Sequence, residues 1–333
     1  MHAAQSATLA LVADIGGTHA RFALATPDHQ GRPVLTSMRE LTVAHFSSMA
    51  QAALHYMQQI DAPRPRRSVI AVASAVTGDE IKMTNNPWSF SIAGLQQQLG
   101  LEGIEVINDF AAIAMAIPHL APAEFEPVGA VAAPAPGLKP ERRCAVVGPG
   151  TGLGVCGLLV RQGRVIVIES EGGHVAFAPG NDYEIAILRY MMSRHARVSV
   201  ERLVSGPGLQ NLYQAVCAVE GAAAVVRTPE GITAGAKVGA EAACGRAVEL
   251  FCSILGSFAG DVALMYGAWD GVYLGGGMTT TLLPWICGGE FRQRFENKGR
   301  YGSLMQKIPT AAIAHAQPGL LGAGARALDP PSG

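Results

Sequence analysis

The sequence is poor in charged side chains and has no extended run of basic residues. Only 15% of its residues are Asp, Glu, Lys or Arg, and the formal net charge is -1. The short basic segment PRPRR at 63–67 is typical of a solvated loop. Because nucleic-acid binding needs a concentrated positive surface, this composition disfavours a nucleic-acid partner.

The sequence also lacks cysteines at the spacing of zinc or redox sites. Its six cysteines are scattered through apolar segments, and none forms a Cys-x-x-Cys pair. Isolated cysteines of this kind are typical of small buried side chains in a reducing compartment. We therefore expect a cytoplasmic protein without bound zinc.

Neither a signal peptide nor a membrane span is expected. Residues 1–13 have no cationic start, and Asp14 interrupts the apolar run that begins at Leu9. The apolar run 144–160 contains Pro149 and several glycines, which disfavours a spanning helix. The sequence thus predicts a soluble protein with no membrane partner.

Two common phosphate-binding motifs are missing or out of context. No Gly-Lys-Ser/Thr occurs, so the chain is not a P-loop protein. Residues 152–157, GLGVCG, match Gly-x-Gly-x-x-Gly, and Glu171 follows at the distance of a ribose-binding acid. That pattern indicates a dinucleotide site only where a helix follows the glycines. Here a predicted hairpin, LLVRQGRVIVI, follows them, so the dinucleotide interpretation fails.

Short apolar runs alternate with helix-like segments, which is the pattern of an α/β protein. Strands are predicted over 68–76 and 103–109, and helices over 93–100 and 110–117. A Pro/Ala-rich passage at 117–143 then interrupts the pattern, because proline continues neither a helix nor a strand ladder. With 333 residues the chain is long enough for two domains, and this passage is the predicted junction.

The strand pattern resumes after the junction. Strands are predicted over 144–147 and 155–160, on either side of a glycine turn, and RQGR marks a hairpin to a third strand. Residues 235–266 predict one or two long helices, and a strand is predicted over 271–278.

Two glycine-rich turns share one layout. In VADIGGTHARFAL and in VVGPGTGLGVCGLL, a strand runs into a glycine turn that carries a threonine, Thr18 or Thr151, and a second strand follows. This weak repetition indicates two halves built on one plan, with the turns facing each other. Either turn alone could be a tight hairpin without a ligand. The pair, together with a third glycine cluster at 275–277, favours phosphate binding by backbone N–H groups.

Asp14 precedes the first glycine turn at the end of a predicted buried strand. A carboxylate beside bound phosphates would repel them unless a cation lay between. Mg²⁺ keeps several waters and is commonly held by one or two carboxylates together with substrate phosphates. We therefore interpret Asp14 as a magnesium-binding residue, acting through water.

Seven segments together resemble the bacterial glucokinases of the hexokinase and actin-like ATPase superfamily. The similarity runs in order from about residue 9 to residue 328, in ADIGGTHARFAL, TNNPWSFS, INDFAAIAMAIP, GPGTGLGV, EGGHVAFAP, ERLVSGPGLQNLY and YLGGGM. The repressor–kinase branch of sugar kinases carries a cysteine-rich zinc motif after a Gly-His pair. Here Gly173 and His174 are followed by VAFAPGND, so the chain resembles the zinc-free branch.

The resemblance implies a two-domain α/β fold of the actin-like ATPase (ribonuclease H-like) type, with an active-site cleft between the domains. A small α/β domain would comprise residues 1–119 plus about 315–333, and a large α/β domain would comprise about 120–314. The chain would return to the small domain through a helix predicted at 317–328.

The resemblance also implies the activity. It is the ATP-dependent phosphorylation of D-glucose at the 6-hydroxyl, which gives glucose 6-phosphate and ADP in the first step of glycolysis. The ATP-binding set implied by the family comprises Ala13, Asp14, Ile15, Gly16, Gly17, Thr18, Gly150, Thr151, Gly152, Gly275 and Gly276. Mg²⁺ would accompany ATP at Asp14.

Asn108 and Asp109 lie where a predicted strand ends and a helix begins. Asp109 alone could be a helix N-cap. Strand ends in open α/β sheets are also where ligands bind, and phosphorylation of a hydroxyl needs a base to accept its proton. The resemblance assigns Asp109 to that catalytic role and Asn108 to a sugar hydroxyl. Asn85 is a further candidate neighbour of the sugar.

Glu171 and His174 are three residues apart, which allows a metal pair. Two intervening glycines favour a loop, however, and no third ligand is nearby. Glu201 could be a first-turn acid favoured by a helix dipole. The resemblance instead implies a glucose site made by Asn108, Asp109, Glu171, His174 and Glu201, whose donors and acceptors suit a ring of hydroxyls.

Three other functions are alternatives to glucose phosphorylation. Another sugar or acyl kinase of the same superfamily would share these motifs and differ in its preferred substrate. A transcriptional repressor would need a helix-turn-helix before the first strand, which is expected to begin by Thr8. An actin-like filament or chaperone ATPase would not need the Asn-Asp and Glu-Gly-Gly-His groups. A homodimer is left open.

Overall fold

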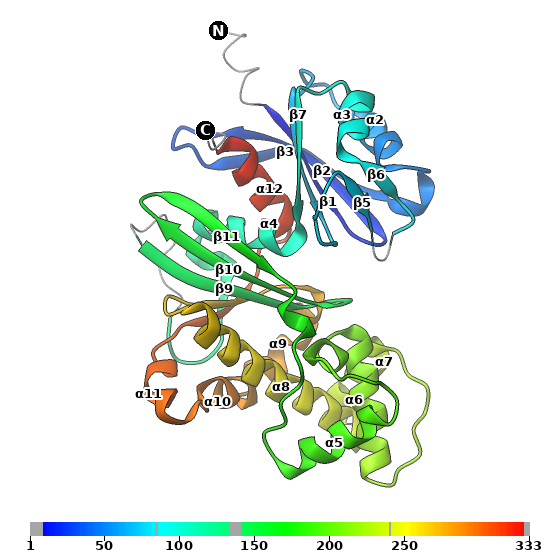
Figure 1. Ribbon diagram of the computed structural model, residues 1–333, viewed down its shortest axis with the longest axis vertical. Coiled ribbons are helices and arrows are strands. Elements are labelled where there is room, and N and C mark those ends of the chain that lie inside the picture. The colour runs from blue at the N-terminus through cyan, green and yellow to red at the C-terminus, as the bar shows by residue number, and fades with distance from the viewer. Residues whose placement is uncertain (1–8, 84–85, 133–140, 240, 330–333) are drawn as a thin grey trace. The chain divides into compact units, whose positions relative to one another are not determined.

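The computed structural model describes residues 9–83, 86–132, 141–239 and 241–329, and the chain divides into two compact units. The first unit extends to Ala121 and resumes at His315, and the second lies between them in the sequence. In Figure 1 the first unit is blue to cyan with a red C-terminal helix, and the second is green to orange. Each unit is built on its own central sheet.

The sheet of the first unit has the strand order β3-β2-β1-β4-β7. Strands β1, β2 and β3 are antiparallel neighbours, whereas β4 and β7 run parallel to β1. The strands are β1 (Ala10–Ile15), β2 (His19–Pro27), β3 (Pro33–Thr42), β4 (Arg67–Val72) and β7 (Gly103–Asn108). A separate hairpin is formed by β5 (Glu80–Lys82) and β6 (Ser89–Ser91).

Helices cover both faces of this sheet, because strand side chains alternate between faces. Leu11, Ala13 and Ile15 of β1 pack in one cluster with residues of α2 (Met49–Gln59) and α3 (Ile92–Leu99). Val12 packs in a second cluster with residues of α4 (Asp109–Ala116) and α12 (Pro318–Leu328). Figure 1 shows these helix pairs on opposite sides of the sheet. Short 3-10 turns complete the unit at η1 (Val43–His45) and η2 (Ile117–His119).

The sheet of the second unit has the order β11-β10-β9-β12-β13-β8. Its strands are β8 (Phe125–Pro127), β9 (Glu141–Pro149), β10 (Leu153–Arg161), β11 (Arg164–Ser170), β12 (Val272–Leu274) and β13 (Thr310–Ile313). Strands β9, β10 and β11 are antiparallel neighbours, while β12 runs parallel to β9 and to β13.

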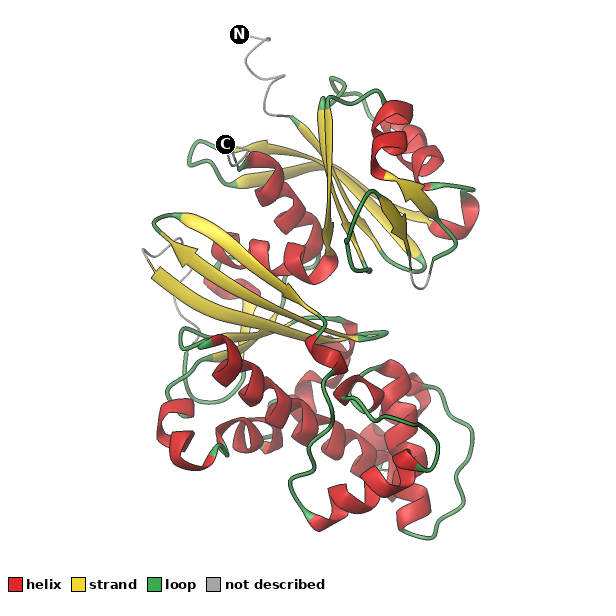
Figure 2. Cartoon of the chain, viewed as in Figure 1, coloured by secondary structure: helices red, strands yellow, loops and turns green. Residues whose placement is uncertain are grey.

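Several helices of the second unit pack against one long, buried helix, α8 (Ala242–Tyr266) (Figure 2). The other helices are α5 (Asp182–Met192), α6 (Gly206–Val219), α7 (Pro229–Val238), α9 (Gly277–Ile286), α10 (Glu290–Glu296) and α11 (Gly302–Met305). The 3-10 turns are η3 (Pro122–Glu124), η4 (Gly172–His174), η5 (Val200–Arg202) and η6 (Gly299–Tyr301). Helix α8 is long and apolar enough to cross a membrane. However, 72% of its most apolar stretch is buried inside the structure, as expected of a core helix.

The two sheets repeat one arrangement. In each, three antiparallel strands joined in sequence are followed by two parallel strands, in the order β3-β2-β1-β4-β7 and β11-β10-β9-β12-β13. The glycine turns stand at equivalent places, between β1 and β2 and between β9 and β10. The repetition predicted from the layout of the two turns is therefore confirmed.

One predicted strand is much shorter than expected. The run 271–278 was expected to be extended, but β12 ends at Leu274 and α9 begins at Gly277. Gly276 has a φ of 80°, and a Cβ built there would lie 2.5 Å from the carbonyl oxygen of Pro149. Glycine permits this left-handed conformation and close approach, so the glycine run turns the chain instead of extending the strand.

Candidate active site

The first glycine turn, residues 16–18, joins β1 to β2 and is held from both sides. Gly16 N donates to His19 O at 2.9 Å, and Val43 N donates to Thr18 O at 2.9 Å. The side-chain amide of Asn86 donates to Gly16 O at 2.9 Å. Gly17 and Thr18 are exposed. The turn is thus fixed by its flanks while its tip remains open to solvent.

Asp14 lies on the sheet face that α4 and α12 cover. Its Oδ2 is 4.0 Å from Nη1 of Arg21, its cross-strand neighbour. A Cβ built on Gly319 would lie 2.8 Å from the same oxygen, so α12 begins directly against this carboxylate. Burial raises the pKa of Asp14, and the charge of Arg21 acts in the opposite direction. A positive charge at this position would stabilise the ionised form.

Asn108 and Asp109 lie at the same edge of the sheet as Asp14. The parallel register places Ile15 beside Val72 and Val72 beside Asn108, at the carboxyl ends of β1, β4 and β7. Neighbouring strands are about 4.8 Å apart, so the outer two strand ends are separated by roughly 10 Å. The first glycine turn and the Asn-Asp pair therefore belong to one end of one sheet.

Asn108, and not Asp109, is the N-cap of α4. Asn108 Oδ1 accepts from Phe110 N at 2.9 Å and from Ala111 N at 3.3 Å, and its amide donates to Ser74 O at 3.4 Å. Asp109 is the first helical residue, and its Oδ1 accepts from Phe110 N at 2.9 Å. The interpretation of Asp109 as a plain N-cap is wrong, because the preceding amide already fills that position.

The second glycine turn, residues 150–152, joins β9 to β10 in the second unit. Gly150 N donates to Gly152 O at 2.8 Å, and Gly150 O accepts from Gly206 N at 2.7 Å, where α6 begins. Gly276 packs against Pro149 immediately before the turn, and Gly275 N donates to Val147 O at 3.0 Å. The structure therefore brings the third glycine cluster beside the second turn.

Glu171, His174 and Glu201 form one polar cluster in this unit. Nε2 of His174 is 3.8 Å from Oε1 of Glu201 and 4.0 Å from Oε2 of Glu171. The His174 carbonyl accepts from Arg197 Nη1 at 2.6 Å, which fixes the backbone of the loop. Glu171 and His174 are more than half exposed, at 67% and 57% of their side chains. The cluster thus offers donors and acceptors at a solvent-accessible surface.

The two glycines between Glu171 and His174 allow this loop to pack closely. A Cβ on Gly173 would lie 2.2 Å from the carbonyl oxygen of Leu153, and one on Gly172 would lie 3.1 Å from the side chain of Val155. The 3-10 turn η4 therefore rests on the start of β10, directly after the second glycine turn. Within the described parts of the chain, no three His, Cys, Asp or Glu residues are grouped to hold a metal ion.

The predicted residues thus fall into two sets, one in each unit. Asp14, Gly16, Gly17, Thr18, Asn108 and Asp109 share the sheet end of the first unit, where Ala13 and Ile15 are buried strand residues. Gly150, Thr151, Gly152, Glu171, His174, Glu201, Gly275 and Gly276 lie around the start of β10 in the second. Asn85 lies outside the described residues.

Sequence reasoning missed Asn86 and Arg197, which hold the first turn and the η4 loop. Asn86 lies in the TNNPWSFS segment, which carries part of the family resemblance. The resemblance therefore pointed to this segment but not to the contact that Asn86 makes. No sequence signal distinguishes Arg197 from other surface arginines.

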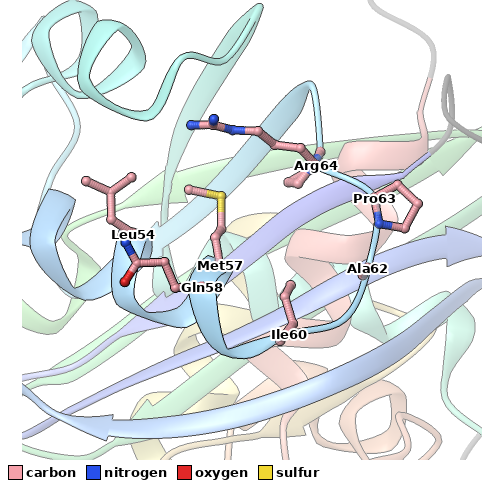
Figure 3. Close-up of a pocket in the computed structure, with 8 residues that line it drawn as sticks. Leu54, Met57, Gln58, Ile60, Ala62, Pro63 and Arg64 are labelled. Atoms are coloured by element: carbon pink, nitrogen blue, oxygen red, sulfur yellow. The ribbon is translucent and has the colours of Figure 1, made fainter.

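A cavity of about 220 Å³ in the first unit contains none of the predicted residues (Figure 3). It is lined by Leu54, Met57, Gln58, Ile60, Ala62, Pro63, Arg64 and Pro65. These residues end α2 and precede β4, whereas Asp14 and Asn108 stand at the carboxyl ends of their strands. The cavity therefore belongs to the opposite end of the sheet.

Known proteins resemble this chain over nearly its whole length. A family model described as Glucokinase matches residues 11–330. The chain is 48% identical over 320 residues to a glucokinase of Stenotrophomonas maltophilia strain K279a, covering 96% of this chain and 95% of that protein. A solved glucokinase structure from an Antarctic psychrotroph is 34% identical, with a TM-score of 0.86 over 96% of this chain and 98% of that one.

A more distant structure shares the fold alone. The glucokinase of Balamuthia mandrillaris, solved in complex with glucose, is 20% identical to this chain, with a TM-score of 0.78 over 96% of this chain and 93% of that one. Together with the two units described above, these similarities confirm the predicted two-domain α/β fold class of the actin-like ATPases.

Proposed function

This chain belongs to the glucokinase family, and from that premise we propose that it phosphorylates D-glucose at the 6-hydroxyl with ATP. The products are glucose 6-phosphate and ADP, and the reaction is the first step of glycolysis. The observation that carries the proposal at the level of the site is the cluster of Glu171, His174 and Glu201 beside the second glycine turn. These side chains suit the hydroxyls of a hexose, and they lie next to a turn that suits phosphate.

The glucose hydroxyls would be bound by Glu171, His174 and Glu201 of the second unit and by Asn108 and Asp109 of the first. Ionised carboxylates accept hydrogen bonds from hydroxyls, while an imidazole can both donate and accept. The exposure of Glu171 and His174 leaves them accessible to a polar ligand. A site built from such groups discriminates against analogues that lack a hydroxyl, because its polar atoms would then be left without partners.

Asp109 would be the general base. It takes the proton of the 6-hydroxyl as that oxygen bonds to the γ-phosphorus, while the bond from the γ-phosphorus to the bridging oxygen breaks and ADP leaves. Its place in the first turn of α4, after the carboxyl end of β7, supports this role. Asn108, which caps the same helix, would hold Asp109 in position.

ATP would be bound by the glycine turns. The tip of the first turn, at Gly17 and Thr18, is exposed, and the second turn lies beside the start of α9 at Gly276 and Gly277. Backbone N–H groups in glycine turns and at helix N-termini stabilise phosphate oxygens, and the threonine hydroxyls add donors. The remaining members of the predicted ATP-binding set flank these turns.

Asp14 fits a magnesium ion that accompanies ATP. It is a single carboxylate at a strand end, its side chain is 21% exposed, and burial raises its pKa, so a nearby cation would compensate its charge. One carboxylate with waters and substrate phosphates is a common magnesium donor set. When bound, the ion would neutralise charge on the phosphates; the chain supplies Asp14 to hold it through water.

A cytoplasmic location is part of the proposal. Five of the six cysteines are buried, which suits a reducing compartment. The protomer has a mass of 34.6 kDa, so light scattering distinguishes a monomer from a homodimer of twice that mass.

The test is a comparison of hexoses with ATP and magnesium, monitored by ADP release so that every sugar is detected alike. Glucose is expected to give the highest kcat/KM, and phosphorus NMR should place the new phosphate on the 6-oxygen. A higher kcat/KM for mannose or another hexose would favour a different sugar kinase. Absence of any sugar-dependent ADP release would refute the proposal.

A further inference from the structure

The carboxylate of Glu201 lies between the second glycine turn and His174, a second member of the same polar cluster. Its Oε2 accepts a hydrogen bond from Leu153 N at 2.9 Å, where β10 leaves the turn. Its Oε1 faces His174, with Nε2 at 3.8 Å. Only 29% of the side chain is exposed, against 67% for Glu171 and 57% for His174. Glu201 therefore touches both parts of the proposed site.

Gly152 is a glycine because of this carboxylate. A Cβ built there would lie 2.7 Å from Glu201 Oε2, well inside van der Waals contact, and the backbone of Gly152 does not have the positive φ that favours glycine. The absent side chain therefore makes room for Glu201. In α8 of the same unit, a Cβ on Gly245 would meet nothing within 4 Å.

The backbone around Glu201 is joined to the same turn. The Ser205 hydroxyl donates to Glu201 O at 2.8 Å and accepts from Gly208 N at 3.0 Å, which caps α6. Gly206 N then donates to Gly150 O at 2.7 Å. The backbone and the side chain of Glu201 are thus both linked to residues 150–153. A change in the rotamer of Glu201 would therefore remove a hydrogen bond at the end of the turn.

We infer that Glu201 is a positioning residue for the second glycine turn as well as a sugar ligand, so that glucose and nucleotide binding are coupled within the second unit. The inference rests on the proposed function, since it takes Glu201 to bind a hexose hydroxyl and the turn to bind phosphate. A carboxylate has lone pairs for several donors, so Oε2 holds Leu153 N while Oε1 accepts from the sugar.

Glucose is expected to strengthen nucleotide binding. A hydroxyl bound to Oε1 fixes the rotamer of Glu201, and this rotamer is the one that holds Leu153 and the turn. A nucleotide that binds afterwards meets a turn that is already ordered, so its affinity rises. By linkage, a nucleotide must raise the affinity for glucose by the same factor.

The decisive variant is Gly152→Ala, with Gly245→Ala as its matched control. The added methyl of Gly152→Ala displaces only the end of a flexible side chain, so the fold is expected to persist, as thermal unfolding will show. It should raise the Kd for glucose, measured by calorimetry without nucleotide, by about 10-fold, the scale of one lost charged hydrogen bond. Gly245→Ala adds the same methyl to open space and should leave glucose affinity unchanged.

A second pair of variants separates the two roles of Glu201. Glu201→Gln keeps an acceptor for Leu153 N and should retain affinity for a nonhydrolysable ATP analogue while weakening glucose binding. Glu201→Ala removes both contacts and should also weaken the analogue and abolish its strengthening by glucose. If Gly152→Ala does not fold, this pair decides the question alone.

Two results would overturn the inference. One is wild-type glucose affinity in folded Gly152→Ala, and the other is wild-type analogue affinity and coupling in Glu201→Ala. Failure of the wild-type protein to bind glucose would instead contradict the proposed function. The two failures are therefore distinguishable.

Discussion

Asp109 is the residue on which the proposed proton transfer depends. Asp109→Asn keeps nearly the same shape, and Asn108 continues to cap α4, so the variant should fold and bind glucose. Loss of a general base should lower kcat by about 10²–10⁴-fold. Turnover is to be measured alongside glucose binding by calorimetry. A variant that kept more than a tenth of wild-type turnover would remove Asp109 from the mechanism.

The ionised carboxylate of Asp14 is expected to serve magnesium binding but to lower the stability of the fold. Burial raises its pKa, so the folded protein binds this proton more tightly than the unfolded chain does. Stability is therefore lost as the pH rises from the ordinary aspartate pKa through the raised folded value. Asp14→Asn removes that loss and should raise Tm at pH 7 without metal by about 2 °C.

The same variant should be the poorer enzyme. Asp14→Asn has no negative charge to hold a cation, so the magnesium concentration for half-maximal activity should rise. The Tm difference should shrink as the pH is lowered from 8 toward the ordinary aspartate pKa. An equal or lower Tm across that range, with an unchanged magnesium requirement, would contradict the role given to Asp14.

Residue identities were more predictable than residue contacts. Asp14, Asn108 and Asp109 stand out in the sequence because they interrupt apolar strand ends. The roles of Glu171, His174 and Glu201 came only from the family resemblance. The bond from Leu153 N to Glu201 joins positions 48 residues apart, and the bond from Asn86 to Gly16 spans 70. Such contacts depend on how distant elements pack, which local patterns do not encode.

At the scale of elements, the two glycine turns are expected to serve the nucleotide. Thr18 and Thr151 are exposed on them, and Thr→Val at either position keeps the shape but removes a hydroxyl donor. Each variant should raise the KM for ATP by about 5-fold, the effect of roughly 1 kcal/mol of hydrogen bonding, and leave the glucose Kd near wild type. If both altered only glucose affinity, the assignment of the turns would be wrong.

Element types followed from local pattern, while some element boundaries did not. The strand predicted over 68–76, for example, ends as β4 at Val72. The strands flanking both turns were predicted because apolar runs ending in glycine are distinctive. The end of β12 at Leu274 was not, because Gly276 adopts its positive φ in contact with Pro149, more than a hundred residues earlier. A glycine run permits either outcome, and tertiary packing selects between them.

Helices α5 and α10 are joined by a buried ion pair that should dominate local stability. Arg294 donates from Nη1 to Glu184 Oε1 at 2.6 Å and from Nη2 to Oε2 at 3.1 Å, and Glu184 is 1% exposed. Arg294→Met leaves a buried carboxylate without its main counter-charge and should cost about 3–5 kcal/mol in urea unfolding.

The control is an exposed pair in the other unit. Arg66 pairs with Glu102, and both side chains are more than half exposed, at 60% and 59%. Arg66→Met should change the free energy of unfolding by less than about 1 kcal/mol. Equal losses for Arg294→Met and Arg66→Met would show that burial of the first pair does not matter.

For the whole molecule, the repeated sheet order explains why the proposed roles divide into two sets. Each sheet presents a glycine turn between two antiparallel strands, β1 and β2 in the first and β9 and β10 in the second, and each unit carries its own group of polar residues. Asp109, the proposed base, belongs to the first unit, and the proposed sugar ligands Glu171, His174 and Glu201 belong to the second. Neither unit contains all of the residues to which we assign a role in sugar phosphorylation.

This division makes closure on glucose a testable expectation. If one glucose contacts both sets, as proposed above, its binding must favour conformations that bring the sets together. Glucose should then reduce the radius of gyration measured by X-ray scattering and increase the affinity for ATP. Exclusion of water from the closed site should make ATP hydrolysis slow without sugar and phosphoryl transfer fast with it. Equal rates of ATP hydrolysis with and without glucose, at an unchanged radius of gyration, would reject closure and favour a motor-type ATPase, in which hydrolysis needs no sugar.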